Sequence, residues 1–268
     1  MDKKPIYTAL LTIVIVLAGT TLLAVYGQSG VEYTWSRYRP LIGGIRVTSL
    51  VYYTNSSGVF VKTSQSTLSY AVRRNSDNQT GVIIAGHAIY EVPGNLSYAL
   101  IYQPNRTSSD YVNNITLVNV YITGDFAFVP YQNVSPQLLY ITQDNYTRPI
   151  QLYINTTVRW NQLTQTFVYK TGQRTGTTSG YIEYGIESCI YQSNTTGRTY
   201  TYTYCIITNV PALSGDSGSP LFKYGVGRDG RPWVGLYGHY LGRTNNNKTV
   251  FISVEAVYQS NFTPLTVG

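Results

Sequence analysis

A serine in a setting that suits a covalent nucleophile stands in the segment Ser-Gly-Asp-Ser-Gly-Ser-Pro at residues 214–220. Glycines on either side of Ser217 allow a tight backbone turn, in which backbone N–H groups can point at one developing oxyanion. The segment differs from the G-x-S-x-G elbow of the α/β-hydrolases, because Ser219 takes the place of the second glycine. A serine hydroxyl becomes a strong nucleophile beside a general base, so a histidine should accompany Ser217.

The order of the titratable residues selects that histidine. The chain has two histidines, His87 and His239. His239 follows Ser217 too closely to complete the order Ser, acid, His of the α/β-hydrolases. Asp2 and Asp77 are the only aspartates before His87, and neither suits an order that begins with the acid. The order His, Asp, Ser remains, with His87 as the base.

The acid follows from the local sequence around each candidate. Four aspartates lie between His87 and Ser217: Asp110, Asp125, Asp144 and Asp216. Two of them lie in polar turn segments, and Asp216 adjoins the serine. Asp125 opens the apolar run Asp-Phe-Ala-Phe-Val, in which a buried carboxylate needs a partner. Orienting an imidazole through its Nδ1–H is such a partnership, so we predict a triad of His87, Asp125 and Ser217.

The elements that carry these residues are predicted to be strands. The chain has 27 tyrosines and only 12% charged residues, and short β-rich segments alternate with turn clusters throughout. Turn signals at intervals of about 8–12 residues are typical of all-β barrels and sandwiches. The strands fall into two groups of about six, and residues 253–259 form the one short helix expected after residue 27. The net charge of +7 is scattered, which argues against nucleic acid as a partner.

The N-terminal residues indicate export from the cytoplasm. Lys3 and Lys4 precede an uncharged, apolar run, so residues 1–27 are expected to form a signal peptide or a membrane anchor in a helix, and both remain open. Residues 28–44 would be a connector. Eleven asparagines begin an N-x-Ser/Thr sequon, which predicts N-glycans on an extracellular surface: Asn55, Asn78, Asn95, Asn105, Asn114, Asn133, Asn145, Asn155, Asn194, Asn247 and Asn261.

Two cysteines, Cys189 and Cys205, complete the inventory of reactive side chains. In an oxidising compartment they are expected to form a disulfide. Two isolated cysteines without a neighbouring histidine make a poor metal site, and we expect neither a metal nor a cofactor.

Four segments together resemble the trypsin/chymotrypsin-like serine peptidases, and most of all their bacterial streptogrisin and α-lytic branch. The nucleophile segment Ile-Ile-Thr-Asn-Val-Pro-Ala-Leu-Ser-Gly-Asp-Ser-Gly-Ser-Pro-Leu at residues 206–221 is the most specific of the four. The others are the strand and Ala-Gly-His segment at 68–88, Gly-Asp-Phe-Ala-Phe-Val at 124–129, and the glycine-rich stretch at 170–180.

The resemblance implies a fold, an activity and further site residues. The fold would be two packed six-stranded antiparallel β-barrels, at about 45–135 and 148–262 within a peptidase domain at 45–268. The protein would be a secreted or membrane-anchored serine endopeptidase that hydrolyses a polypeptide through an acyl-enzyme. The N–H groups of Gly215 and Ser217 would bind the oxyanion. Substrate would be bound at four positions: Pro211, Gly238, His239 and Tyr240.

Departures from the family pattern limit these expectations. Ala88 stands where the family has a cysteine, and Cys189 and Cys205 would instead join two strands of a hairpin in the second barrel. Asp216 would need a cationic partner, for which Arg174 is the candidate, displaced by one residue. Residues 209–214 hold no acid, so a small or apolar P1 side chain is expected. The alternative function is a non-catalytic, glycosylated surface or adhesion module that retains the peptidase fold.

Overall fold

The computed structural model describes residues 31–141, 149–193, 195–227, 230 and 232–267. The predicted signal peptide or anchor at 1–27 lies outside these residues. Within the described part of the chain, no helix has the length and apolar character that crossing a bilayer requires. Among these residues, helix is confined to α2 (Val31–Thr34), α3 (His87–Tyr90), α4 (Val254–Gln259) and four 3₁₀ turns, which confirms the all-β prediction and the short C-terminal helix.

The strands of the N-terminal half are β1 (Leu41–Gly43), β2 (Arg46–Asn55), β3 (Gly58–Arg74), β4 (Thr80–Ala85), β5 (Asn95–Tyr102), β6 (Tyr111–Ile115), β7 (Val120–Tyr121), β8 (Phe126–Pro130) and β9 (Val134–Tyr140). Those of the C-terminal half are β10 (Ile150–Tyr153), β11 (Thr156–Thr157), β12 (Phe167–Gly172), β13 (Gly176–Gln192), β14 (Thr199–Thr208), β15 (Pro220–Val226), β16 (Pro232–Arg243), β17 (Thr249–Ser253) and β18 (Phe262–Pro264).

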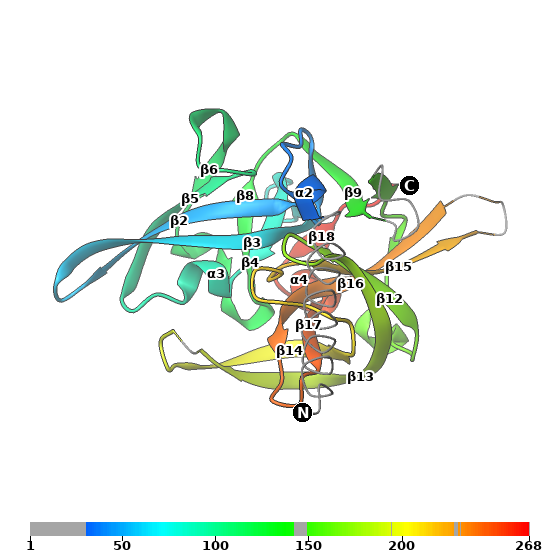
Figure 1. The fold of residues 1–268 in the computed structure, drawn as a ribbon. Coiled ribbons are helices and arrows are strands. Elements are labelled where there is room, and N and C mark those ends of the chain that lie inside the picture. The colour runs from blue at the N-terminus through cyan, green and yellow to red at the C-terminus, as the bar shows by residue number, and fades with distance from the viewer. Residues whose placement is uncertain (1–30, 142–148, 194, 228–229, 231, 268) are drawn as a thin grey trace, which may run out of the picture.

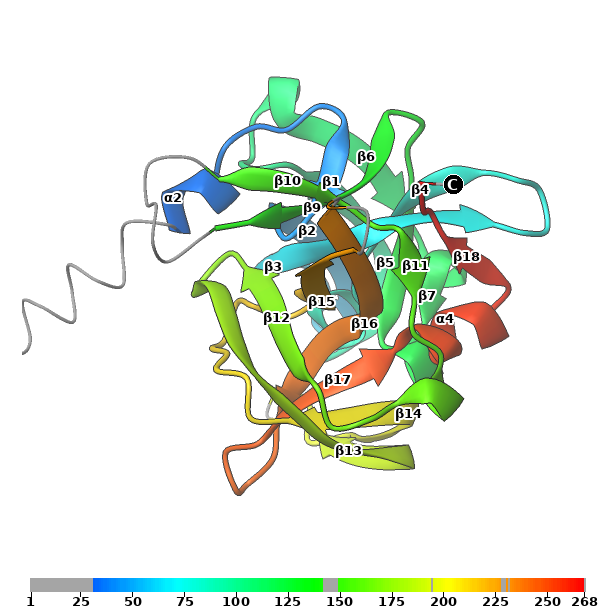
Figure 2. The same ribbon diagram turned by 90° about the vertical axis from the view of Figure 1, so that its right-hand side faces the viewer.

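The C-terminal half forms a closed six-stranded barrel. Its strands run in the order β16-β15-β12-β13-β14-β17, and β17 pairs again with β16 to close the ring (Figure 2). Val168, Ile182, Ile206, Leu221 and Phe251 fill its centre and are almost completely buried. Each such side chain contributes about 1.5–3 kcal/mol of hydrophobic stabilisation. The predicted second barrel is therefore confirmed.

The N-terminal half is a curled sheet that stays open, and here the predicted closed barrel is wrong. Its path is β6-β5-β2-β3-β4-β8-β7, with β18 added beside β3. The 3₁₀ turn Leu117–Asn119 interrupts the chain between β6 and the two-residue β7. Across the remaining gap, Asn113 on β6 donates a side-chain hydrogen bond to the Pro130 carbonyl at the end of β8, at 2.6 Å. Side-chain bonding thus replaces a strand ladder at this edge.

A shared core fixes the two halves together. Phe126 and Phe128 of the open sheet pack in one buried cluster with Phe222 and Leu236 of the barrel and Phe262 of β18. A third, three-stranded sheet, β1-β9-β10, contains strands from both halves (Figure 2). Because rigid contacts extend across the boundary, side chains at the ends of strands in either half can hold fixed positions relative to each other.

Candidate active site

His87 begins the one-turn helix α3, directly after strand β4. The intervening Gly86 has no room for a side chain, since a Cβ there would lie 2.8 Å from the backbone nitrogen of Phe126. The Gly86 N–H donates to the Asp125 carbonyl at 2.9 Å. This close backbone approach requires glycine, and it brings the start of α3 against the turn that carries Asp125.

Asp125 stands between the turn Ile122–Gly124 and strand β8, with a left-handed backbone (φ 47°) and a fully buried side chain. Its Oδ2 lies 2.8 Å from His87 Nδ1, and its Oδ1 accepts the His87 backbone N–H at 2.8 Å. The left-handed conformation is uncommon for a residue with a side chain. Here contacts from both sides hold it, and they direct the carboxylate at the imidazole.

Ser217 lies on the loop that precedes β15, with its Oγ 2.8 Å from His87 Nε2. The open sheet holds this loop, because the Thr67 N–H donates to the Ser217 carbonyl at 2.8 Å. Gly218 has φ +88°, and a Cβ at this residue would lie 2.3 Å from the Thr67 carbonyl oxygen. The structure thus brings together His87, Asp125 and Ser217, which are far apart in the sequence.

The electrostatics of His87 suit a general base. Burial acts to lower its pKa, but the charge of Asp125 and the hydrogen bond to it outweigh burial and raise the pKa above the ordinary value of 6.5. The carboxylate only accepts hydrogen bonds, so Nδ1 carries the proton and Nε2 is free to accept one from Ser217. This arrangement can deprotonate a hydroxyl and stabilise the resulting imidazolium.

The residues before Ser217 form a turn that could bind an oxyanion. Gly215 has φ +99°, a conformation that favours glycine. Among the described residues, no acceptor is bonded to the backbone N–H of Gly215 or of Ser217. Two free N–H groups flanking a hydroxyl are the arrangement that stabilises a tetrahedral intermediate.

The buried Asp216 side chain stabilises this turn, and Lys170 is the cationic partner of the Asp216 carboxylate. Both side chains are fully buried, with Lys170 Nζ 3.2 Å from Asp216 Oδ2. The same carboxylate accepts the backbone N–H of Leu213 at 3.0 Å and that of Arg174 at 2.9 Å. Arg174 thus contributes a backbone contact only, which corrects the expectation that its guanidinium pairs with Asp216. Burial lowers the pKa of Lys170, opposed by the charge of Asp216.

His239 and Tyr240 occupy positions that differ from the expected substrate-binding surface. His239 is fully buried between the two halves, where its Nε2 donates to the Gly124 carbonyl at 3.0 Å and its Nδ1 accepts from the Tyr70 hydroxyl at 3.3 Å. Burial lowers the pKa of His239. The two hydrogen bonds occupy both ring nitrogens, so His239 supports the turn before Asp125 instead of facing substrate.

Gly238 and Tyr240 are likewise engaged within the barrel. The Tyr240 N–H donates to the Ser219 carbonyl, and its own carbonyl accepts the Gly218 N–H. Gly238 is paired with strands on both sides, opposite Leu221 and Ser253. Strand partners or backbone bonds thus lie on both sides of these two residues, whereas Pro211 is exposed on the loop that leads to Ser217.

Several supporting residues were missed in the sequence. Lys170 is a lone lysine in the apolar run of β12, and this buried charge was the available signal for a partner of Asp216. Tyr90 donates from its hydroxyl to Asp125 Oδ1 at 3.0 Å, but among 27 tyrosines nothing in the sequence marked it out.

The surface features predicted from sequence are partly visible. Cys189 and Cys205 form a disulfide that joins β13 to β14, as expected. The nine sequon asparagines within the described residues are all exposed, and two of the eleven, Asn145 and Asn194, lie outside those residues. Exposure is the condition that N-glycosylation requires.

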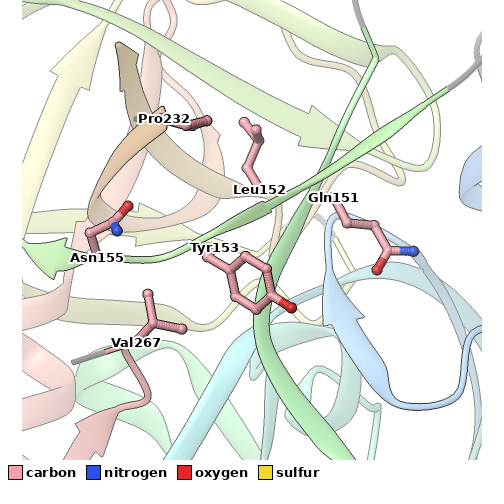
Figure 3. A pocket seen from close by; sticks show the side chains of 6 residues that line it. All are labelled: Gln151, Leu152, Tyr153, Asn155, Pro232 and Val267. Atoms are coloured by element: carbon pink, nitrogen blue, oxygen red, sulfur yellow. The ribbon is translucent and has the colours of Figure 1, made fainter. Parts of the chain in front are cut away.

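A surface hollow of about 380 Å³ lies apart from these residues (Figure 3). Its lining residues are Gln151, Leu152, Tyr153, Asn155, Pro232 and Val267. None of them belongs to the candidate triad or contacts it through a hydrogen bond that the structure describes. The hollow therefore adds nothing to the chemistry of the site.

Comparisons with known proteins agree with the architecture. The fold matches Cellulomonas bogoriensis chymotrypsin at a TM-score of 0.53 and 20% identity, and Thermobifida fusca protease A at 0.51 and 19%. It also matches a Nocardiopsis protease at 0.50 and 18%. Each match covers 84% of this chain and 98% of the other. The chain has the chymotrypsin-like fold. No protein-family model matches the sequence, and neither does any curated protein sequence.

Proposed function

We propose that this chymotrypsin-like protein is a serine endopeptidase that cleaves polypeptides through an acyl-enzyme. One observation supports the proposal above all: the unbroken series of hydrogen bonds from Asp125 Oδ2 through His87 to Ser217 Oγ, with both links at 2.8 Å. A fold alone does not determine function. The argument therefore rests on the geometry of these three side chains and on the free N–H groups beside them.

In the proposed reaction His87 Nε2 takes the proton of Ser217 as Oγ bonds to the scissile carbonyl carbon. The carbonyl oxygen becomes an oxyanion, which accepts from the N–H groups of Gly215 and Ser217. The C–N bond then breaks, and His87 gives its proton to the leaving amine. Water attacks the acyl-enzyme by the same route, with His87 again taking and returning a proton. Asp125 stays ionised and stabilises the imidazolium.

A strand edge near Ser217 is available to pair with the substrate backbone. Pairing of β15 with β16 ends at Pro220 and His239, and the strand continues to Arg243. On its other side this last segment still pairs with β17, as Gly242 does with Val250. Among the described residues no strand pairs with 241–243 on the β15 side, so an extended peptide can add there as a further strand. This edge takes the place of the earlier assignment to Gly238–Tyr240.

The P1 side chain is proposed to be small or apolar. Of the residues before the nucleophile, Pro211 and Leu213 are exposed and Ala212 is buried, and none carries a charge. We also propose that the protein acts outside the cytoplasm, secreted or membrane-anchored, since the exposed sequons and the disulfide both fit an oxidising, glycosylating compartment.

A peptide-library cleavage assay tests the proposal. Wild-type protein should cleave after small or apolar residues, whereas Ser217→Ala and His87→Ala should lose roughly 10⁶-fold in kcat. Ser76→Ala, which changes an exposed serine in a distant turn, is the matched control and should retain activity. Equal cleavage by Ser217→Ala would refute the triad. Absence of any cleavage by folded wild type would favour the glycosylated binding module.

A further inference from the structure

The Asp125 carboxylate is held by more than His87. Its Oδ1 accepts two hydrogen bonds, one from the His87 backbone N–H at 2.8 Å and one from the Tyr90 hydroxyl at 3.0 Å. Tyr90 is 6% exposed and Asp125 is fully buried. The phenol and the backbone N–H therefore take the place that water would otherwise fill around this charge.

Tyr90 in turn is bonded to Tyr202 on strand β14. The two hydroxyl oxygens lie 2.5 Å apart, and Tyr202 is fully buried. A phenol has one hydrogen to donate, and that of Tyr90 is directed to the carboxylate. Tyr202 must therefore be the donor of the second bond, and the series runs from Tyr202 through Tyr90 to Asp125.

This series links the two halves of the molecule. Tyr90 belongs to α3 of the open sheet, whereas Tyr202 belongs to the β13–β14 hairpin, which extends from the barrel towards α3 (Figure 1). The ring of Tyr200 packs 5.0 Å from that of Tyr90, and the ring of Tyr191 lies 6.4 Å from that of His87. The Cys189–Cys205 disulfide joins the two strands of this hairpin.

We propose that Tyr90 and Tyr202 are positioning residues for the reaction, which hold the Asp125 carboxylate and tune its interaction with His87. The inference rests on the proposed peptidase function. A neutral donor on Oδ1 draws negative charge away from Oδ2, the oxygen that faces the imidazole. Each such donor therefore weakens the attraction between Asp125 and His87⁺. Hydrogen bonds to an ionised group are also about twice as strong as neutral ones, so the carboxylate keeps one orientation.

Removing the Tyr90 hydroxyl should change both properties. With one donor to Oδ1 lost, more of the negative charge of Asp125 would act on the imidazole, so the pKa of His87 would rise further. The carboxylate would also be less firmly oriented. The other charged or titratable groups facing the pair are Glu91, Lys62, His239 and Tyr191. All four remain in a Tyr90→Phe variant, so a shift would report the loss of one hydroxyl.

The test is the pH dependence of kcat/KM for Tyr90→Phe, Tyr202→Phe and Tyr200→Phe. We expect Tyr90→Phe to lose about ten- to a hundredfold in kcat, the value of a hydrogen bond to a charged group, with little change in KM. Its acid limb should move to higher pH. Tyr202→Phe should shift the limb less, in the same direction. Tyr200 lies in the same cluster without a hydroxyl partner among the described residues, so Tyr200→Phe should match wild type.

The outcomes separate this inference from the proposed function. An active wild type with an unchanged pH profile in Tyr90→Phe would overturn the inference and leave the peptidase proposal standing. An inactive wild type would overturn both. If a thermal melt shows that Tyr90→Phe is unfolded, the pH profile of Tyr202→Phe is the deciding measurement. A Tyr202→Phe profile identical to that of wild type would then overturn the inference.

Discussion

The two halves of the molecule hold their share of the site by different means. The closed barrel supports the Ser217 loop through the buried Lys170–Asp216 pair and the backbone bonds around Asp216, and the open sheet adds the bond from the Thr67 N–H to the Ser217 carbonyl. The open sheet carries His87 and Asp125, but much of the support for Asp125 comes from across the boundary. His239 on β16 holds the turn before Asp125, and Tyr202 on β14 is linked to the Asp125 carboxylate through Tyr90.

This difference indicates why an open sheet suffices in the N-terminal half. A closed barrel pairs its own strand edges and is hard to deform, whereas a curled sheet with a free edge is easier to deform. The barrel is therefore the more rigid half, and its side chains help to hold Asp125 and His87 in position relative to Ser217. Three substitutions or measurements test this comparison.

Lys170→Met should have the largest effect, because it leaves the Asp216 charge buried and unpaired. Breaking a buried pair costs about 3–5 kcal/mol of the free energy of unfolding. The oxyanion turn should also loosen, with a loss of about 10²–10³-fold in kcat. Denaturant unfolding and kinetics measure both. Lys223→Met, at a partly exposed lysine on β15, is the matched control, and equal effects in the two variants would contradict the role of the Lys170–Asp216 pair in holding the Ser217 loop.

His239→Leu tests the support that crosses the boundary. It leaves the Gly124 carbonyl and the Tyr70 hydroxyl buried without their partner, at a cost of about 1–3 kcal/mol. We expect about tenfold lower kcat, since the Asp125 turn can then move. His239→Gln retains an N–H donor and should recover part of the loss. Full activity in His239→Leu would show that the open sheet positions Asp125 alone.

The pH profile of the wild type gives the smallest but most specific effect. His87 must be neutral to act as base, and its pKa lies above 6.5 because Asp125 outweighs burial. Activity should therefore fall as the pH drops through a pKa above that value. His239 stays neutral there, since burial lowers its pKa, and one limb is expected. In Asp125→Asn the limb should move to lower pH, and an unmoved limb would contradict the assignment.

The sequence was informative where chemistry left few choices. Two histidines and one apolar aspartate segment led to His87 and Asp125, and a glycine-flanked serine led to Ser217, all of which the structure brings within hydrogen-bonding distance. The pattern of strands and turns likewise predicted an all-β fold, and the resemblance to the chymotrypsin-like peptidases predicted the C-terminal barrel. The prediction failed for closure of the N-terminal sheet, since closure depends on how edge strands meet and not on the pattern within each strand.

Other residues could not be assigned because their roles arise from tertiary contacts. His239 and Tyr240 lie in a strand that resembles a substrate-binding one, but only the register of β15 with β16 shows that their backbones are occupied. Tyr90 and Tyr202 meet through the approach of the β13–β14 hairpin to α3, which local sequence does not encode. The pairing of Lys170 with Asp216 depends in the same way on how the loop before β15 packs against β12.

The most direct test of the central claim is to map a fluorophosphonate adduct by mass spectrometry. The account predicts a single covalent adduct on Ser217, formed more slowly as His87 becomes protonated and absent in both Ser217→Ala and His87→Ala. An adduct on another serine, or labelling that persists without His87, would contradict the claim that the imidazole 2.8 Å from Ser217 Oγ activates it.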